Sequence, residues 1–176
     1  MGNRSGSDDA SLAGSEVAAD LLPVLDRHLQ WVASGWECGK RADLHGRDLH
    51  DIDLHDALLS DADLHRADLH AAVLGGCELL GADLHRCDLR EADLHGADLQ
   101  WADLHDANLH GADLSGAILD AADLHRADLQ EADLTHAALN GTDLRGADLR
   151  QARGLTRAQL LAATVDGGTL LPELEV

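Results

Sequence analysis

A leucine recurs every five residues, without interruption, from Leu44 to Leu149, and this spacing constrains the fold more than any other feature. Of these 22 central leucines, 17 have alanine two residues earlier and 16 have aspartate directly before them. On an α-helix, steps of five residues turn successive leucines by about 140° and scatter them around the circumference. On a flat strand they fall on alternate faces. The period therefore excludes both a single helix and a flat strand.

A short extended piece followed by a corner does accommodate this period. Each piece points one alanine and one leucine inward, and each corner directs the next pair toward the same interior. Stacked coils of this kind bury a continuous core and pair their backbone groups. Eight glycines that stand two residues after a central leucine suit the corners. Because the chain has no Phe or Tyr, this core consists almost wholly of Leu and Ala.

The motif A-(D/N)-L-x-x, seen here as ADLHG, ADLHR and ANLHG, closely resembles that of the pentapeptide-repeat family. The resemblance covers residues 42–152 and implies an all-β solenoid, a right-handed quadrilateral β-helix with twenty residues per coil. Twenty-two repeats then make about 5.5 coils, and a coil spacing of about 4.8 Å gives a rod about 26 Å long.

The open ends of such a rod need caps, since bare edges invite pairing with other chains. Residues 1–15 are expected to be a disordered tail, and residues 16–41 a helical cap, because apolar residues stand at helical spacing between 20 and 33. Residues 153–176 are expected to form a C-terminal helical cap, in which Thr156 and Gln159 make a capping box. The resemblance implies that this segment supports a homodimer.

Residues twenty apart stack into columns if the coil has twenty residues. One side then carries a histidine ladder, defined as His45, His65, His85, His105 and His125. On the same side runs an aspartate column of Asp43, Asp63, Asp83, Asp103, Asp123 and Asp143. The next side contributes Asp48, Asp68, Asp88, Asp128 and Asp148. Together these aspartates form the predicted acidic surface.

The histidine ladder has three interpretations. Neutral imidazole beside carboxylate suits Zn²⁺, Cu²⁺ or Ni²⁺, so the ladder is a candidate metal-binding strip. Alternatively, the histidines relieve repulsion between stacked carboxylates, or their protonation makes the surface charge depend on pH. A one-dimensional ladder lacks the converging ligands of a structural zinc site, so the sequence predicts adventitious binding and no cofactor.

The fourth side of the coil departs from the acidic rule. It carries Leu58, Leu80, Trp101, Ile118 and Ala138 at outward or corner positions. Scattered exposed apolar residues are normal on any protein surface. Five on one side, including a tryptophan, equally predict a face for a partner or a second copy.

Charge and composition limit the function further. The chain carries a formal charge of -20, of which -17 falls within residues 42–152. A strongly negative field repels nucleic acid and anionic lipid and favours basic protein surfaces. The sequence contains no phosphate-binding loop, nucleophile elbow or H-E-x-x-H motif, so no enzyme is predicted. The three cysteines have no metal-ligand spacing, and no apolar signal core stands at the start, so a cytoplasmic location is expected.

Two functions lead. Some pentapeptide-repeat proteins mimic DNA, occupy the DNA-binding saddle of DNA gyrase or topoisomerase IV, and protect the enzyme from topoisomerase poisons. This chain resembles them in repeat and acidity, but it has Leu instead of Phe at every central position and no long loop between coils. The alternative is an acidic interaction scaffold that binds a partner through its apolar side. Binding of metal or protons by the histidine ladder is the third hypothesis.

Overall fold

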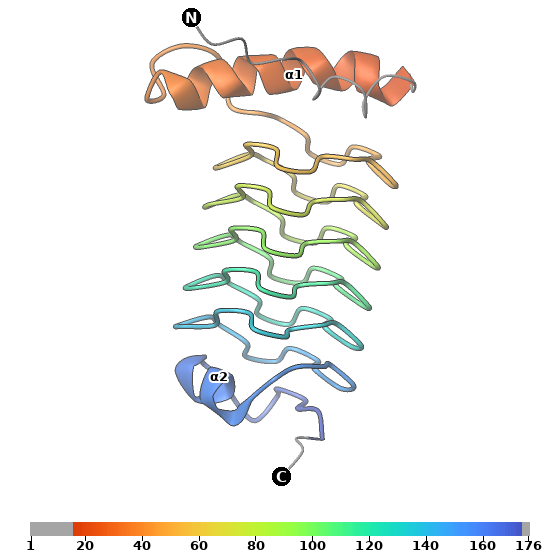
Figure 1. The fold of residues 1–176 in the computed structure, drawn as a ribbon, viewed down its shortest axis with the longest axis vertical. Helices are drawn as coiled ribbons and strands as arrows, with labels where there is room; N and C mark the ends of the chain where they lie inside the picture. The colour runs from red at the N-terminus through yellow and green to blue at the C-terminus, as the bar shows by residue number, and fades with distance from the viewer. Residues whose placement is uncertain (1–15, 174–176) are drawn as a thin grey trace, which may run out of the picture.

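The structure, a computed structural model, describes residues 16–173 and shows a stack of coils between two helices (Figure 1). From Asp43 to Asp133, parallel bridges join each residue before a central leucine to the residue twenty positions later, as in Asp43–Asp63 and Asp63–Asp83. Four such bridging positions occur in each turn, so the coil has twenty residues and four sides. We number the sides by their bridging residues: first (43 to 143), second (48 to 148), third (53 to 153) and fourth (58 to 138), each in steps of twenty.

The interior is the expected stack of leucine and alanine. All 22 central leucines are at most 3% exposed. At three buried alanine positions a Cys or Thr stands instead, and each donates a hydrogen bond to a leucine carbonyl of the preceding coil. Cys77 Sγ donates to Leu54 O (2.9 Å), Cys87 Sγ to Leu64 O (2.8 Å), and Thr142 Oγ1 to Leu119 O (2.7 Å). Burial raises the pKa of both thiols to about 12, so they act as small core residues.

Each corner is a tight turn with a positive φ. The N–H of the third residue after a central leucine donates to that leucine's carbonyl, as Arg47 does to Leu44 (3.1 Å). The residue two after the leucine has φ between +54° and +70° in all 22 corners, which is the type II turn geometry. Only eight of these residues are glycine. Fourteen L-residues therefore adopt a conformation that costs about 1 kcal/mol or more each, and the stacked pairing holds them there.

Helix α1 (Glu16–Ala33) lies across the first coil and covers that end of the core (Figure 1). Its Leu21 and His28 are fully buried. His28 Nδ1 accepts the N–H of Ala42 (3.0 Å), which joins the helix to the start of the first coil. Trp31 contacts the His28 ring at 5.6 Å between centroids, whereas Trp36 is 66% exposed.

The opposite end is covered by the short helix α2 (Arg157–Ala162) and the strand-like segment after it. The predicted capping box is present, with Thr156 as N-cap and Gln159 at N3. Gln159 Nε2 also donates to the carbonyls of Leu134 (3.2 Å) and Ala137 (2.9 Å) in the last full coil. After α2 the chain pairs again, Thr164 with Asp143 and Leu170 with Asp148. The C-terminal cap is thus a helix followed by a partial coil. The tail predicted at residues 1–15 lies outside the described residues.

Among residues 16–173, no helix has the length and apolar character needed to cross a membrane.

Candidate functional site

The aspartates before the central leucines bind the backbone of the rod. Four of the five amides in a typical repeat donate to backbone carbonyls, and the amide directly after the leucine is left over. Fifteen of the 16 aspartates accept this N–H through Oδ1, as Asp63 does from His65 (3.2 Å) and Asp123 from His125 (2.8 Å). Asn108 does the same for His110. The aspartate of the repeat is therefore a local turn-capping group as well as a charge.

Charge is distributed unevenly around the rod. The corner between the first and second sides carries Arg66, Arg86 and Arg126, and the latter two pair with Asp106 at 3.5 and 2.5 Å. The corner between the second and third sides carries Asp51, Glu91 and Glu131 instead. Twelve acidic residues lie on these two sides and the corner between them: Asp48, Asp51, Asp53, Asp68, Asp88, Glu91, Asp93, Asp113, Asp128, Glu131, Asp133 and Asp148. This second–third face is thus an acidic surface whose corner carries no arginine, and it takes in the predicted second-side column but not the first-side column.

Arginines neutralise part of the acidic columns. Arg90 forms two hydrogen bonds with Asp88 (2.7 and 2.5 Å), and its side-chain bond is the main cause that holds the pKa of Asp88 below its usual range. Arg150 makes the same contact with Asp148 (2.9 and 2.6 Å) and likewise lowers its pKa. In contrast, Asp48 and Asp68 on the second side are exposed.

Four rings of the histidine ladder, from His45 to His105, lie one above another, but they are not evenly spaced. Ring centroids lie 4.6 Å apart for His45–His65, 3.6 Å for His65–His85 and 4.5 Å for His85–His105, and the last two pairs are stacked. His85 Nδ1 lies 2.9 Å from Asp83 Oδ1, and His105 Nδ1 lies 2.6 Å from Asp103 Oδ1. These contacts agree with the interpretation that the histidines relieve the repulsion between carboxylates.

Burial and neighbouring rings shift the protonation of the ladder. Burial lowers the pKa of His65, and the adjacent rings of His85 and His45 lower it further. Burial of the Asp83 carboxylate favours a higher pKa. The hydrogen bonds that His85 donates to it outweigh this effect and keep the pKa of Asp83 below its usual value. The side-chain Nε2 of His65 is buried and makes no hydrogen bond. His65 therefore has one ring nitrogen without a hydrogen-bond partner.

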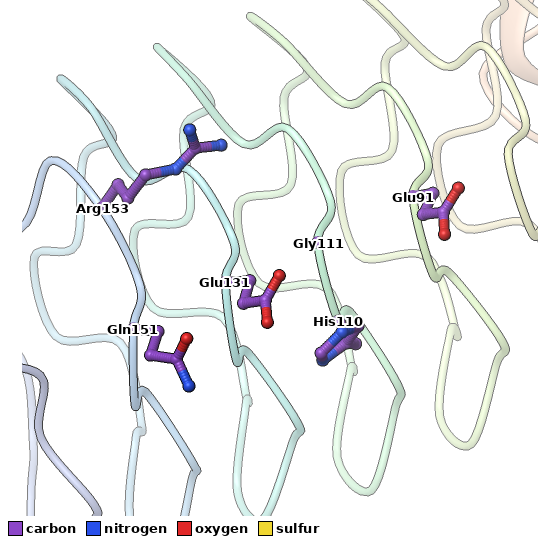
Figure 2. Close-up of a pocket in the computed structure, with 6 residues that line it drawn as sticks. All are labelled: Glu91, His110, Gly111, Glu131, Gln151 and Arg153. Carbon is purple, nitrogen blue, oxygen red and sulfur yellow. The ribbon is translucent and has the colours of Figure 1, made fainter.

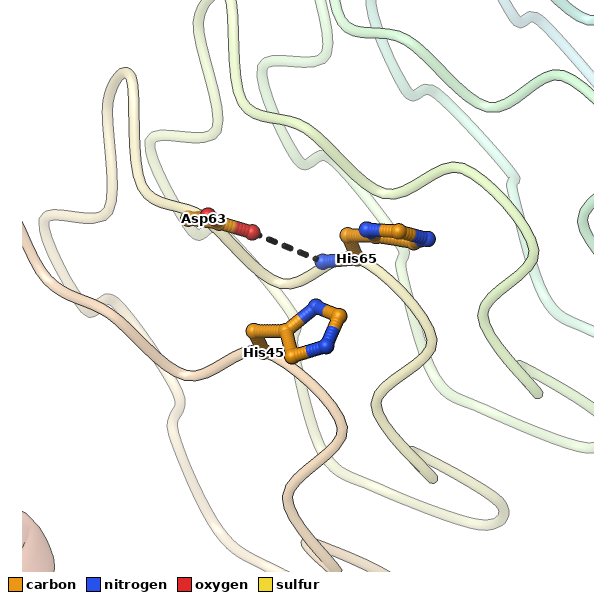
Figure 3. Close-up of side chains that lie close together, drawn as sticks. All are labelled: His45, Asp63 and His65. Carbon is orange, nitrogen blue, oxygen red and sulfur yellow. Dashed lines mark hydrogen bonds between the residues drawn. The ribbon is translucent and has the colours of Figure 1, made fainter.

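Two groups along the ladder could hold a metal ion. His45, Asp63 and His65 form one, with their ligand atoms all within 4.8 Å of one another (Figure 3). His85, Asp103 and His105 form the other by the same rule. Each group combines a histidine with the aspartate and histidine of the following coil. The sequence placed these side chains in adjacent columns but did not predict that the carboxylate converges on two rings.

The fourth side exposes apolar residues, but they do not form one continuous patch. Trp101 is 65% exposed, and Leu58 and Ile118 are each a little over one third exposed. Glu78 and Asp98 stand in the same column between Leu58 and Ile118. Leu80 and Ala138 are half-buried. The ring of Trp101 projects from a corner whose neighbours one coil away are Gly81 and Ala121.

Two hollows on the described part of the chain have polar linings. A groove of about 520 Å³ runs along the corner of the second–third face and is lined by Glu91, His110, Gly111, Glu131, Gln151 and Arg153 (Figure 2). A crevice of about 220 Å³ between α1 and the first coil is lined by Val24, Arg27, Lys40, Arg41, Asp43 and Arg47. Arg47, an inward position of the first coil, thus reaches the cap region. Neither hollow has the apolar walls typical of a small-molecule site.

A model of pentapeptide repeats matches the chain in eight copies, over residues 40–76, 67–106, 97–135, 107–146 and 127–163. The chain belongs to the pentapeptide-repeat family. Its rod is accordingly a right-handed quadrilateral β-helix, as the sequence predicts. No protein with a curated function matches the chain significantly in sequence.

Solved pentapeptide-repeat proteins resemble the chain along most of its length. HetL from the cyanobacterium Nostoc sp. strain PCC 7120, a protein involved in heterocyst differentiation regulation, is 30% identical, with 74% of this chain and 73% of HetL covered and a TM-score of 0.46. A thylakoid-lumen member from Arabidopsis thaliana is 31% identical over 68% of this chain and 72% of its own, with a TM-score of 0.28. QnrB1, a plasmid-mediated fluoroquinolone resistance protein, is 17% identical over 76% and 80%, with a TM-score of 0.45.

Proposed function

We propose that this pentapeptide-repeat protein is a DNA mimic that binds the DNA-binding surface of DNA gyrase or topoisomerase IV and protects the enzyme from topoisomerase poisons. The observation that carries the proposal is a net charge of -17 arranged in regular columns on a rod. Duplex DNA has one charge per about 1.7 Å, or about 15 over the rod's estimated 26 Å. The rod therefore matches DNA in linear charge density.

The second–third face is the part of the rod that suits this role. It presents twelve carboxylates, whereas the corner on the other edge of the second side presents three arginines. Most of its aspartates are fixed by the bond from Oδ1 to the backbone, as Asp93 is to the N–H of His95 (3.1 Å). Carboxylates held in place in advance lose little freedom on binding. The proposed role is binding and not catalysis, and it places the protein in the cytoplasm with its target.

A gyrase supercoiling assay tests the proposal, with and without a fluoroquinolone and across a salt series. A DNA mimic inhibits the enzyme or rescues it from the poison, and the effect weakens as salt rises. The informative variant combines Asp51→Asn, Glu91→Gln and Glu131→Gln, because these corner residues carry charge without capping a turn. We expect it to lose most of the effect.

The matched control combines Asp56→Asn and Asp61→Asn, which lie on other corners with the same backbone conformation (φ +55° and +59°). This control should keep the effect of the unmodified protein. No effect of the unmodified protein at micromolar concentration and low salt contradicts the proposal, as does equal loss in both variants.

A second candidate is an interaction scaffold that uses the fourth side, and the 65% exposure of Trp101 favours it. The proposed homodimer has a second possible surface at the C-terminal end. There Leu161 of α2 is 78% exposed, and Leu170 and Leu171 are nearly half exposed. Sedimentation of Trp101→Glu and Leu161→Glu separates the two surfaces. Loss of a dimer in Leu161→Glu alone assigns self-association to the C-terminal end. Loss in Trp101→Glu alone assigns it to the fourth side.

A further inference from the structure

Two copies of one side-chain arrangement stand on the first side of the rod. Each contains two histidines from successive coils and the aspartate that precedes the second histidine by two residues. The first copy is His45, Asp63 and His65, and the second is the same arrangement two coils later, at His85, Asp103 and His105. Because the two groups have the same composition and spacing, a property that follows from this arrangement should be found at both.

We propose that each copy binds one divalent transition-metal ion, with Zn²⁺ as the reference ion, through two imidazole nitrogens and one carboxylate oxygen. The proposal is independent of topoisomerase binding. Two imidazoles and a carboxylate are a ligand set that zinc accepts, and water completes a four-coordinate site. Two ions per chain would then lie two coils apart, or about 10 Å.

The ring nitrogens needed for this are available. His65 Nε2 is buried, yet it has no hydrogen-bond partner, and an unpaired buried polar atom is costly. His85 Nδ1 lies 2.9 Å from Asp83 Oδ1, which leaves Nε2 free. Metal-bound histidines commonly donate their other ring N–H to a carboxylate in this way, because the bond fixes the ring and its tautomer. Asp83 is thus a positioning residue for the second site.

The geometry requires only side-chain movement. Ligand atoms around one zinc ion lie about 3.3 Å apart when the bonds are about 2.0–2.1 Å long. The atoms of each group lie within 4.8 Å here, and His45, the outermost ligand, is exposed and free to turn. Asp63 Oδ1 accepts the N–H of its own turn (3.2 Å; Figure 3), and Asp63 Oδ2 lies 3.5 Å from the exposed Arg41, which a bound ion would displace. The acidic rod also concentrates cations near its surface.

The other coils of the ladder do not offer the same arrangement. Within the described residues, His65, Asp83 and His85 do not form such a group, and neither do His105, Asp123 and His125. The second side has His50 and His70 at the same twenty-residue spacing, also without a converging group. The proposal therefore predicts two ions per chain and not one for every pair of histidines.

Equilibrium dialysis of the full chain against micromolar Zn²⁺ tests this, with the bound metal counted by elemental analysis and the affinity measured by calorimetry. All proteins carry Cys38→Ser, because Cys38 is an exposed thiol. We expect two ions per chain. His65→Gln should lower the count to one, and His65→Gln combined with His105→Gln should lower it to none. The matched control, His50→Gln with His70→Gln, should keep two.

Circular dichroism checks that each variant is folded, and His45→Gln with His85→Gln replaces the partner ligands as a second route to the same loss. Undiminished binding by both double ladder variants overturns the proposal. Fewer than one ion bound to the unmodified rod, or equal loss in the control, also overturns it, because the latter result means that zinc is dispersed over surface histidines.

Discussion

The first and fourth sides of the rod pair their backbones in the same way, but they differ in which group accepts the N–H of the residue after the central leucine. On the first side, five aspartates from Asp63 to Asp143 accept the N–H that follows the central leucine. On the fourth side only Asp98 does so, and Asn140 obtains its acceptor from Asp120 of the preceding coil instead. Both sides nevertheless continue the ladder of parallel bridges without a break.

This difference separates what the fold needs from what the surface displays. The buried leucine is required on every side, because it fills the interior of each coil. The aspartate is a local stabiliser that the fourth side largely does without. A side without aspartate is free to carry apolar residues, and a side with aspartate acquires a charged column. The following predictions break or sharpen this distinction.

The largest effect is expected from the core. Leu104 lies behind the first side and Leu119 behind the fourth, and both are fully buried. Replacing either with alanine should lower the free energy of unfolding by about 2–5 kcal/mol, since it removes apolar burial and leaves a cavity. Urea unfolding measures both. A difference between them of more than about 2 kcal/mol contradicts the view that the sides are equivalent inside.

Removing a turn cap should cost less. Asp123→Ala on the first side and Asp98→Ala on the fourth each leave one amide without its acceptor, so we expect a loss of about 1 kcal/mol in either case. Asp123→Asn should be close to neutral, because Asn108 already shows that an amide oxygen makes the same bond. If the asparagine variant is as unstable as the alanine variant, the stabilisation comes from charge and not from the hydrogen bond.

The corners after the fourth side allow a smaller change of opposite sign. Ala121 has φ +58°, so Ala121→Gly should raise the free energy of unfolding by about 0.5 kcal/mol through relief of the left-handed conformation. Gly141, one coil later, has φ +70° and open space where a Cβ would stand, so Gly141→Ala should lower it by a similar amount. Thermal unfolding of both variants measures the two changes in stability. If both changes have the same sign, backbone conformation is not their cause.

The last prediction concerns pH at the N-terminal end, where α1 meets the first and fourth sides. Burial is the largest cause that lowers the pKa of His28, and the charge of Arg41 also lowers it. The charge of Asp61 and a hydrogen bond with the Ser60 backbone raise this pKa, but by less. A pKa below 6.5 means that the folded state holds fewer protons than the unfolded state. The stability that His28 contributes is thus present above pH 6.5 and lost as the pH falls through its lowered pKa.

Urea unfolding at pH 7.5 and pH 5.5 measures this, because the carboxylates with lowered pKa titrate below that window. His28→Gln should flatten the dependence. His50→Gln is the control of opposite sign, since the hydrogen bond that the His50 ring donates to Asp48 raises the pKa of His50. An unchanged slope in His28→Gln contradicts the assignment.

The columns could be predicted once the resemblance to pentapeptide-repeat proteins supplied the twenty-residue coil, because that coil converts residue number directly into position around the rod. The inward leucines from Leu44 to Leu149 and the capping box of Thr156 and Gln159 follow from spacing alone, whereas the histidine ladder needs the coil length as well. The bonds from aspartate to the turn amide depend on backbone angles that spacing does not define. The hydrogen bond that the Ala42 N–H donates to His28 and the uneven ring separations in the ladder depend on side-chain orientation, which spacing does not define either.

The coil of twenty residues also determines how the surface responds to changes in chain length. Insertion or deletion of a single five-residue unit preserves the core but rotates every later residue by a quarter turn. The acidic second–third face and the histidine ladder would each be broken at that point, and their continuations would appear on neighbouring sides. Only length changes in multiples of four units leave the pattern in phase. The buried core thus tolerates an insertion or deletion of one unit, although the same change rearranges the exposed surface.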